Sequence, residues 1–496
     1  MSSFIGLDLG TTTTKAVALD ADGSLRATAT SKHHLSSPHT GWAEQPVEVI
    51  WRGVLAALRN LASQVPRQDI RGICLSGAMH SLLPVGEDGA PLAPAMTWAD
   101  ERAASKAKAL RMQTNQHSLY KRTGCPLQPT YYPARLGWLA DAAPDLFHQA
   151  ALFVSIKDWI LFRMTGVWAT DAGLASTTGL LELRKQQWDS DALGMAKITP
   201  ERLPRLVPAE SVVGVLLPEV ARSSGLPAGI PVIAGSTDGG LANLGAGVTQ
   251  PSQAVITVGT SGAVRRVVES PLLDLQERTW CYYFTGKRWF AGGAINNGGL
   301  ALQWVRERFY SNLEGSAGFQ RMMEDAADIP VGSEGALVLP YFTGERSPHW
   351  DAEARAEISG LTMEHSRGHI ARAVMEGVAF CLADVWEALG VSDKDGQPAR
   401  ITGGITQSPL WMQIVADVLG VPLAPVEAAD ASAAGAAMLC QYAMEQLQNG
   451  QKQNISLDQL AGRVTAGAVI KPDEANHAQY IQVHRRFQKL YHQLKQ

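Results

Sequence analysis

The sequence predicts an α/β protein built of two similar domains that face each other across a cleft, and three observations support this prediction. The chain has 496 residues, more than a single hydrophobic core usually accommodates. One pattern, two apolar strands around a turn rich in glycine and hydroxyl side chains, occurs twice, about 250 positions apart. Amphipathic helical patterns fill much of the chain between and after these strands.

The first copy of the pattern reads "FIGLDLGTTTTKAVALDADG". Its near-alternating apolar residues predict two strands joined at 10–14 and ended by the turn Asp22-Gly23. In the second copy, "AVITVGTSGAVRRVV", a strand over 254–258 leads through the turn 259–262 into another strand. We place the boundary between the two domains near 240–247, which predicts domains over 1–244 and 245–496.

Apolar residues at helical spacing predict helices over 47–61 and 366–390. A third helix, over 409–419, is marked at both ends. Ser408 can cap it, Pro409 suits its first position, and Gly420 suits the position just after its end. The turn at 402–404 before this helix contains two glycines, which let a ligand approach the backbone.

Composition limits the function classes. The net charge of −4 argues against a nucleic-acid partner, because such proteins need a basic face. The five cysteines have no C-x-x-C spacing, which predicts reduced and mostly buried thiols and no redox or metal role. The sequence has neither a signal-peptide pattern nor an apolar run long enough for a membrane span, so we expect a soluble cytoplasmic protein.

The turn "DLGTTTTK" has the residues of a phosphate site. Gly10 permits a tight turn, and the backbone N–H groups and hydroxyls of 11–14 can surround phosphate oxygens. Asp8 would repel phosphate unless a cation lies between them, so it indicates Mg²⁺ held through water. The alternative is a threonine-rich hairpin with a solvated aspartate.

Asp238 is the candidate for the catalytic acid–base group. It follows a predicted strand over 230–235 and is itself followed by Gly239 and Gly240, so a substrate could approach closely. A carboxylate there can accept the proton of an attacking hydroxyl. The alternative is that Asp-Gly is only a turn.

These motifs resemble the FGGY family of carbohydrate kinases, which shares its fold with actin, hexokinase and the seventy-kilodalton heat-shock ATPases. The resemblance covers almost the whole chain, through "DLGTTTTK", "STDGG", "VGTSG" and "GGITQSPLWMQIVADVLGVPL". It implies two actin-like (ribonuclease H-like) domains facing a central cleft, and the transfer of the γ-phosphate of ATP, with Mg²⁺, to a sugar hydroxyl.

The resemblance also implies roles for single residues. Asp238 becomes the general base, and Asp8 organises Mg²⁺ through water. The residues implied to bind the nucleotide are Thr11, Thr12, Thr13, Lys15, Gly259, Thr260, Gly299, Gln303, Gly403, Gly404 and Ser408. Ser408 stands where asparagine is common in the family, and a simple helix cap explains it equally well.

The sugar side is predicted on the segments "LSGAMHSLL" and "PAMTWADERA". Aromatic, imidazole and carboxylate groups suit a polyol. The predicted substrate-binding residues are Met79, His80, Trp98, Asp100 and Asp238. The alternatives are a core histidine at position 80 and a core aromatic at position 98. Arg135 stands where the family usually has lysine, which changes the shape of the cation.

The motif 78–81 and the segments 98–100 and 296–299 resemble the gluconokinase branch of the family, with xylulokinase as the next branch. We therefore predict phosphorylation of D-gluconate at C6, with xylulokinase as the alternative. An idle sensor that binds nucleotide or sugar is the alternative from another class. Candidates to bind the gluconate carboxylate are His80, Lys157 and Arg346, and a homodimer is a family-level expectation.

Overall fold

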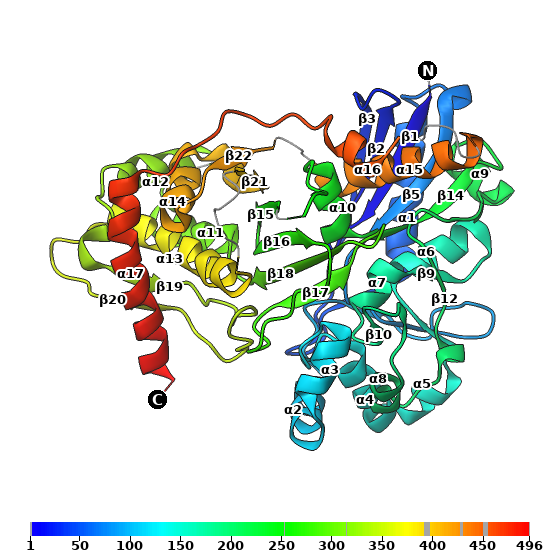
Figure 1. Cartoon of the computed structure of the whole chain (residues 1–496), viewed down its shortest axis with the longest axis horizontal. Helices are drawn as coiled ribbons and strands as arrows, with labels where there is room; N and C mark the ends of the chain where they lie inside the picture. The colour runs from blue at the N-terminus through cyan, green and yellow to red at the C-terminus, as the bar shows by residue number, and fades with distance from the viewer. Residues whose placement is uncertain are drawn as a thin grey trace.

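The structure is a computed structural model that describes residues 2–251, 253–313, 315–390, 397–426, 430–449 and 455–495. It contains two six-stranded mixed sheets, each accompanied by helices (Figure 1). The first sheet belongs to the first half of the chain. The second sheet and its helices belong to the second half, and the helix near the C-terminus lies at the far side of that half.

The first sheet begins as the predicted hairpin. Its spatial order is β13 (Val212–Val215), β14 (Pro231–Thr237), β5 (Ile70–Gly77), β1 (Ser3–Leu9), β2 (Thr13–Asp20) and β3 (Leu25–Lys32). Strands β1 and β2 pair antiparallel around the hydroxyl-rich turn, whereas β5 runs parallel to both β1 and β14. The ends of β1, β5 and β14 therefore bring their following residues to one edge of the sheet.

The second sheet repeats this arrangement. Its order is β17 (Trp280–Tyr283), β18 (Trp289–Ile295), β16 (Gly262–Val268), β15 (Ala254–Val258), β21 (Ala399–Thr402) and β22 (Leu423–Pro425). Strands β15 and β16 form the predicted second hairpin, and β21 runs parallel to β15 and β22. The predicted repeat of one α/β unit is confirmed.

Helices and short strand pairs complete each half. The helices of the first half are α1 (Val47–Ala62), α2 (Ala104–Gln113), α3 (Gln116–Thr123), α4 (Tyr132–Ala142), α5 (Pro144–Gln149), α6 (Ile156–Thr165), α7 (Ala172–Ser176), α8 (Ser190–Ala196), α9 (Pro218–Ser224) and α10 (Asp238–Gly245). Those of the second half are α11 (Gly299–Phe309), α12 (Ala317–Ala327), α13 (Arg367–Ala388), α14 (Pro409–Leu419), α15 (Ala431–Asn449), α16 (Leu457–Ala461) and α17 (Glu474–Leu494). The short pairs are β4 (Glu44–Gln45) with β7 (Ala95–Met96), β6 (Leu83–Val85) with β8 (Leu152–Val154), β9 (Ala169–Asp171) with β12 (Arg205–Val207), β10 (Leu181–Glu182) with β11 (Gln187–Trp188), and β19 (Leu337–Leu339) with β20 (Glu357–Ser359).

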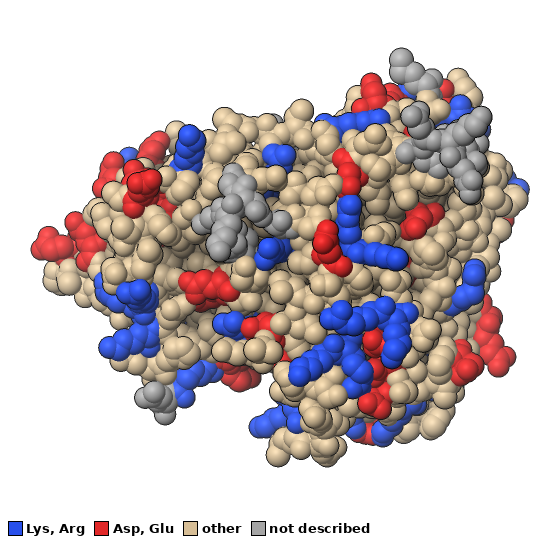
Figure 2. Space-filling view, viewed as in Figure 1, with Lys and Arg blue, Asp and Glu red and all other residues tan. Residues whose placement is uncertain are grey.

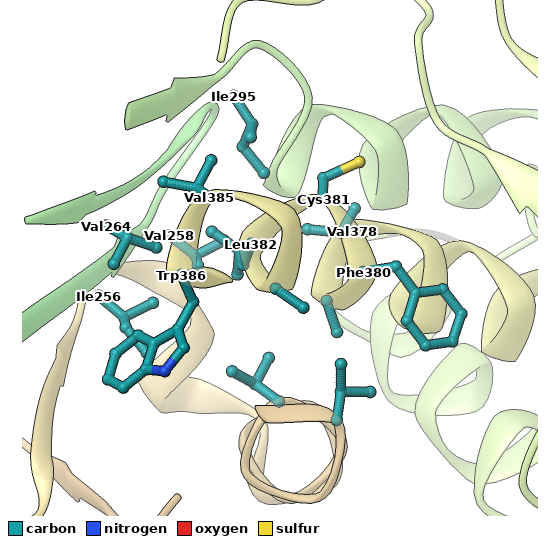
Figure 3. Close-up of a cluster of buried hydrophobic side chains, with 14 of the residues drawn as sticks. Ile256, Val258, Val264, Ile295, Val378, Phe380, Cys381, Leu382, Val385 and Trp386 are labelled. Atoms are coloured by element: carbon teal, nitrogen blue, oxygen red, sulfur yellow. The ribbon is translucent and has the colours of Figure 1, made fainter. Parts of the chain in front are cut away.

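The three predicted helices are α1, α13 and α14. Ser408 caps α14 by accepting a hydrogen bond from the N–H of Trp411, and Gly420 has the left-handed backbone expected after its end. Helix α13 is buried along most of its length, because the second sheet and other helices surround it. Figure 3 shows its Leu382 and Val385 close to side chains of β15 and β16 in the core of the second half.

Helix α15 lies against the first sheet although it follows the second in the chain (Figure 1). It packs on β1, β5 and α10, and small residues make the approach possible. A Cβ atom at Gly6 would lie 1.8 Å from the carbonyl oxygen of Ala433, and one at Gly435 would lie 1.9 Å from that of Leu241. The two halves are therefore joined by close backbone packing at α10 and α15.

All five cysteines are buried free thiols, as predicted. Positive and negative side chains are interspersed over the face shown in Figure 2, and many form ion pairs. Among the described residues, every helix is too short or too polar to cross a membrane.

Candidate functional site

Asp8 lies near the end of β1, directly before the first hydroxyl-rich turn. The hydroxyl of Ser76 on the neighbouring strand β5 donates to its Oδ1 atom at 2.6 Å. Burial is the main reason why the pKa of Asp8 rises to about 7, and the nearby carboxylate of Asp238 raises it further. Two carboxylates thus lie close together in a poorly solvated place, which is unfavourable without a cation.

Asp238 is the first residue of α10, at the end of β14. Thr237 caps this helix by accepting a hydrogen bond from the N–H of Gly240, and Asp238 Oδ1 accepts one from the N–H of Gly239 at 2.7 Å. Burial raises the pKa of Asp238 to about 6, while the Gly239 N–H and the cation of Arg265 act in the opposite direction. A carboxyl group with such a pKa can change its protonation state near neutral pH.

The first hydroxyl-rich turn closes through a hydrogen bond from the N–H of Gly10 to the carbonyl of Thr13, at 3.0 Å. Gln45 Nε2 donates to the carbonyl of Thr11 at 2.5 Å, and the indole N–H of Trp98 donates to the Thr11 hydroxyl at 3.1 Å. Lys15, beyond the turn, forms an ion pair with Asp430, the residue before α15. The turn is therefore fixed from several sides while Thr12 stays exposed.

The second turn packs against the start of α11. The N–H of Gly299 donates to the carbonyl of Gly259 at 2.6 Å, and that of Gly298 donates to the carbonyl of Thr260 at 3.0 Å. A Cβ atom at Gly298 would lie 2.6 Å from the carbonyl oxygen of Ser261, so this contact requires glycine.

A cavity of about 710 Å³ opens beside this second turn. Six of the residues predicted to bind the nucleotide line it, and these are Gly259, Thr260, Gly299, Gln303, Gly404 and Ser408. Apolar side chains form much of the remaining wall, namely Leu300, Phe319, Met323, Ile405, Leu410 and Trp411. The cavity thus has the apolar wall and the neighbouring backbone turn that a nucleoside phosphate would use. The predicted Gly403 adjoins it, with the left-handed φ of 94° that favours glycine.

His80 follows β5 and has the left-handed backbone angle φ of 64°. Its Nδ1 atom lies 2.8 Å from the carbonyl oxygen of Thr177, and a carbonyl only accepts, so Nδ1 carries the proton. Burial is the main reason why the pKa of His80 falls to about 3, and the cations of Arg135 and Arg346 lower it further. His80 is therefore neutral, and its Nε2 atom is available as an acceptor for a hydroxyl.

Trp98 of the first half and Arg346 of the second half contact each other near His80. The Arg346 guanidinium carbon lies 4.8 Å from the centre of the Trp98 ring. Arg346 Nη2 donates to the carbonyl of Ile295 at 3.2 Å, but its buried Nε atom has no hydrogen-bond partner in the described protein. An unpaired buried donor of this kind is costly, and it marks a place where a ligand oxygen would be favourable.

Two of the predicted side chains are already engaged elsewhere. The carboxylate of Asp100 accepts hydrogen bonds from the N–H of Ala43 and, with both oxygens, from Arg102 at 2.6 and 2.8 Å. Lys157 is inaccessible to solvent, lies 3.0 Å from Asp171 Oδ2 and donates to the carbonyl of Ala234. These contacts favour structural roles for Asp100 and Lys157.

Met79 lies at the boundary of the site. A Cβ atom at Gly239 would meet its terminal methyl group at 3.3 Å, and the Met79 N–H helps to lower the pKa of Asp238. The predicted sugar segment and the predicted base are therefore neighbours.

Sequence reasoning missed three residues here. Arg265 on β16 donates to Asn243 Oδ1 on α10 at 2.8 Å and places its charge near Asp238. The hydroxyls of Tyr131 and Tyr282 lie 2.8 Å apart, and both rings meet His80 edge to face. The sequence held one clue to these residues, because Arg265 and Arg266 are two charged residues in the middle of an otherwise apolar strand.

The chain matches known proteins over nearly its full length. The model of the FGGY family of carbohydrate kinases, N-terminal domain, matches residues 3–245, and that of the C-terminal domain matches residues 254–444. The gluconokinase of Bacillus subtilis (strain 168) is 35% identical over 450 residues, which are 89% of this chain and 88% of that protein. The xylulose kinase of Escherichia coli (strain K12) is 30% identical over 494 residues, 99% of each chain. The crystal structure of gluconate kinase from Lactobacillus acidophilus superposes with a TM-score of 0.92, at 30% identity, over 99% of this chain and 98% of that chain.

Proposed function

Because the chain belongs to the FGGY family of carbohydrate kinases, we propose that it uses ATP to phosphorylate D-gluconate at the C6 hydroxyl, giving 6-phosphogluconate. Its identity to the Bacillus subtilis gluconokinase, 35%, exceeds its identity to the Escherichia coli xylulose kinase, 30%. Xylulose is the alternative acceptor, because the xylulose kinase matches 99% of this chain.

The observation that favours a sugar acid as the acceptor is the Nε atom of Arg346, which is buried and has no hydrogen-bond partner in the described protein. Of the three candidates for the carboxylate, His80 is neutral and Lys157 is held by Asp171. Arg346 alone among these three keeps a cation with a free buried donor, above the Trp98 ring and close to His80. A guanidinium is well suited to a carboxylate, whereas a neutral ketose offers no charge to match it.

Asp238 is assigned the role of general base in this proposal. In the transfer, the C6 oxygen forms a bond to the γ-phosphorus of ATP and the bond from that phosphorus to the ADP oxygen breaks. Asp238 takes the proton of the C6 hydroxyl and later releases it to solvent. His80 Nε2 can accept a hydrogen bond from another hydroxyl of the acceptor, which orients the chain of carbons.

We further propose that Mg²⁺ binds near Asp8. Two close carboxylates with raised pKa values fit a cation with oxygen ligands. The described residues contain no cluster of three or more histidine, cysteine or acidic side chains that could hold a metal, so phosphate oxygens and water would supply the direct ligands. When bound, Mg²⁺ neutralises phosphate charge. Asp8 would hold it through water, and the hydroxyl of Ser76 fixes the orientation of the Asp8 carboxylate.

A coupled assay of ADP release across gluconate, xylulose, ribulose, glycerol and fuculose tests the acceptor. We expect the highest kcat/KM for gluconate. A clear preference for xylulose would overturn the choice of acceptor and leave the kinase assignment in place. ATP binding without phosphorylation of any acceptor would instead favour the idle sensor, although a sensor has no need for a base at position 238.

The variant Arg346→Met tests the carboxylate contact. A hydrogen bond to a charged group contributes about 1.5–3 kcal/mol, so kcat/KM for gluconate should fall by about 10- to 100-fold. Activity toward neutral acceptors should change much less. Arg355→Met is the control, because Arg355 belongs to the same segment but is largely exposed. Equal losses for gluconate and for neutral acceptors would contradict the assignment of Arg346 to the carboxylate.

A further inference from the structure

Arg135 on α4 is completely buried and uses all three of its nitrogen atoms to bind backbone carbonyl oxygens. Nη1 donates to His80 and Nη2 donates to Thr97. At 3.3 Å, Nη2 also donates to Asp100 and Nε donates to Pro129. One guanidinium thus connects three segments that are far apart in the sequence.

These segments carry the side chains of the acceptor pocket. His80 itself provides one carbonyl, and the residues on either side of the Trp98–Ala99 dipeptide provide two more. Pro129 lies two residues before Tyr131, whose ring packs against His80. The segments whose side chains would contact an acceptor are therefore fixed through their backbone by Arg135, which would not itself contact the acceptor.

The contact with His80 matters most, because the backbone of that residue is strained. A left-handed φ of 64° is unfavourable for a histidine, and the surrounding structure must enforce it. The hydrogen bond from Arg135 fixes the direction of the His80 carbonyl. It thereby helps to hold the ring between Tyr131 and Tyr282.

A buried guanidinium without an ion pair is expensive to maintain. Within the described chain, Arg135 forms no ion pair, and the nearby Asp100 carboxylate is occupied by Arg102 and the Ala43 N–H. Burial lowers the pKa of Arg135 to about 10, which reflects this cost. An apolar residue of similar size could fill the same volume, so the packing of α4 alone does not explain the arginine.

We propose that Arg135 is a positioning residue that sets the geometry of the acceptor pocket by fixing the His80 and Trp98 segments to each other. The proposal rests on the proposed sugar-kinase function, but not on which acceptor is used. A lysine, the usual residue of the family at this position, would reproduce only part of this arrangement, because an ammonium donates from one atom whereas the guanidinium of this chain reaches four carbonyls around a planar fork.

The variant Arg135→Lys tests this proposal. We expect the KM for the best acceptor of the panel to rise by about tenfold or more, with a smaller change in kcat and an unchanged KM for ATP. Arg202→Lys is the matched control. Arg202 also donates to two backbone carbonyls of the first half, those of Phe147 and Ala150, but these lie away from the pocket residues.

Hydrogen exchange provides a readout that does not depend on the acceptor. In folded Arg135→Lys, amides of 78–81 and 97–100 should exchange faster, whereas those of 404–411 beside the nucleotide cavity should not change. Arg135→Gln, which keeps two donors without a charge, supplies a second variant if the first is unstable. Unchanged acceptor KM and unchanged exchange in a folded variant would overturn the proposal. Inactivity of the wild type toward every acceptor would overturn the proposed function, and the exchange data would still decide the role of Arg135.

Discussion

Lowering the pH tests the role of Asp238 directly. A general base acts only when ionised, and burial raises the pKa of Asp238 to about 6. We therefore expect kcat/KM for the acceptor to fall as the pH drops through this value. The direction follows from the chemistry, because protonation of the carboxylate removes the acceptor for the hydroxyl proton.

The size of the effect follows from the same pKa. A group with a pKa of about 6 is roughly nine-tenths ionised at pH 7 and roughly one-tenth ionised at pH 5, so kcat/KM should fall by about tenfold between these values. An aspartate with the ordinary pKa of 3.8 would stay largely ionised at pH 5. The acidic limb of the profile thus separates a buried base from a solvated aspartate.

Asp8 could produce a similar limb, because its pKa is raised to about 7 and the two carboxylates influence each other. The profile should therefore be measured at several free Mg²⁺ concentrations. Mg²⁺ would compete with the proton at Asp8, so a limb due to Asp8 should move to lower pH as Mg²⁺ increases, and it should move further than a limb due to Asp238.

The variant Asp238→Asn completes the test. It should bind nucleotide normally but lose about 10²- to 10⁴-fold in kcat, the usual contribution of a general base. Its remaining activity should show no acidic limb. A wild-type limb below pH 5, or a variant that keeps most of its kcat, would refute the assignment of Asp238.

Two further predictions concern the second turn and the stability of the protein. Gly298→Ala should raise the KM for ATP about tenfold or more, because the new Cβ atom would meet the Ser261 carbonyl at 2.6 Å. In the control Gly194→Ala the new Cβ atom meets nothing within 4 Å, so the KM for ATP should not change. Equal KM values in the two variants would contradict the proposed role of the turn in binding ATP. Asp8→Asn should raise the midpoint of thermal unfolding at pH 8, measured without nucleotide or metal. Folded Asp8 keeps its proton up to a pH of about 7 but unfolded Asp8 loses it near 3.8, so this group makes folding less favourable as the pH rises between these values. The gain should vanish near pH 4, and a lower midpoint for the variant at pH 8 would contradict the burial of Asp8.

Local patterns were enough to predict the two hairpins and the ends of α14. Alternation sets the face of a strand, and serine, proline and glycine fix the ends of a helix regardless of what lies around them. The position of α15 was not predictable in this way. Its small residues suit close packing. Only the folded chain shows that they contact Gly6 and α10, and not the second sheet, whose strands are nearer in the sequence.

The residues of the candidate site also differ in whether local patterns or distant partners determine their roles. Asp8 lies near the end of β1 and Asp238 follows β14, and the parallel strands β1, β5 and β14 bring such residues to one edge of the first sheet. Lys157 and Arg346 looked equivalent in the sequence. They differ only through distant partners, since Asp171 neutralises Lys157 whereas Arg346 reaches the ring of Trp98 from the other half of the chain.

Two arginines of the second half lie next to candidate site residues of the first half. Arg265 donates to Asn243 on the helix that begins at Asp238, and its charge lowers the pKa of the Asp238 carboxyl. Arg346 lies over Trp98, whose indole N–H holds the Thr11 hydroxyl in the first turn. The ionisation of the proposed base, the shape of the proposed acceptor pocket and the order of the first turn therefore depend on the same placement of one half against the other. If the halves separate, Asp238 loses the nearby cation of Arg265 but also gains water, and because burial is the main cause of its raised pKa, that pKa moves back toward the ordinary value. We expect the transfer to be fastest when both halves are together, which also keeps water away from the phosphoryl group.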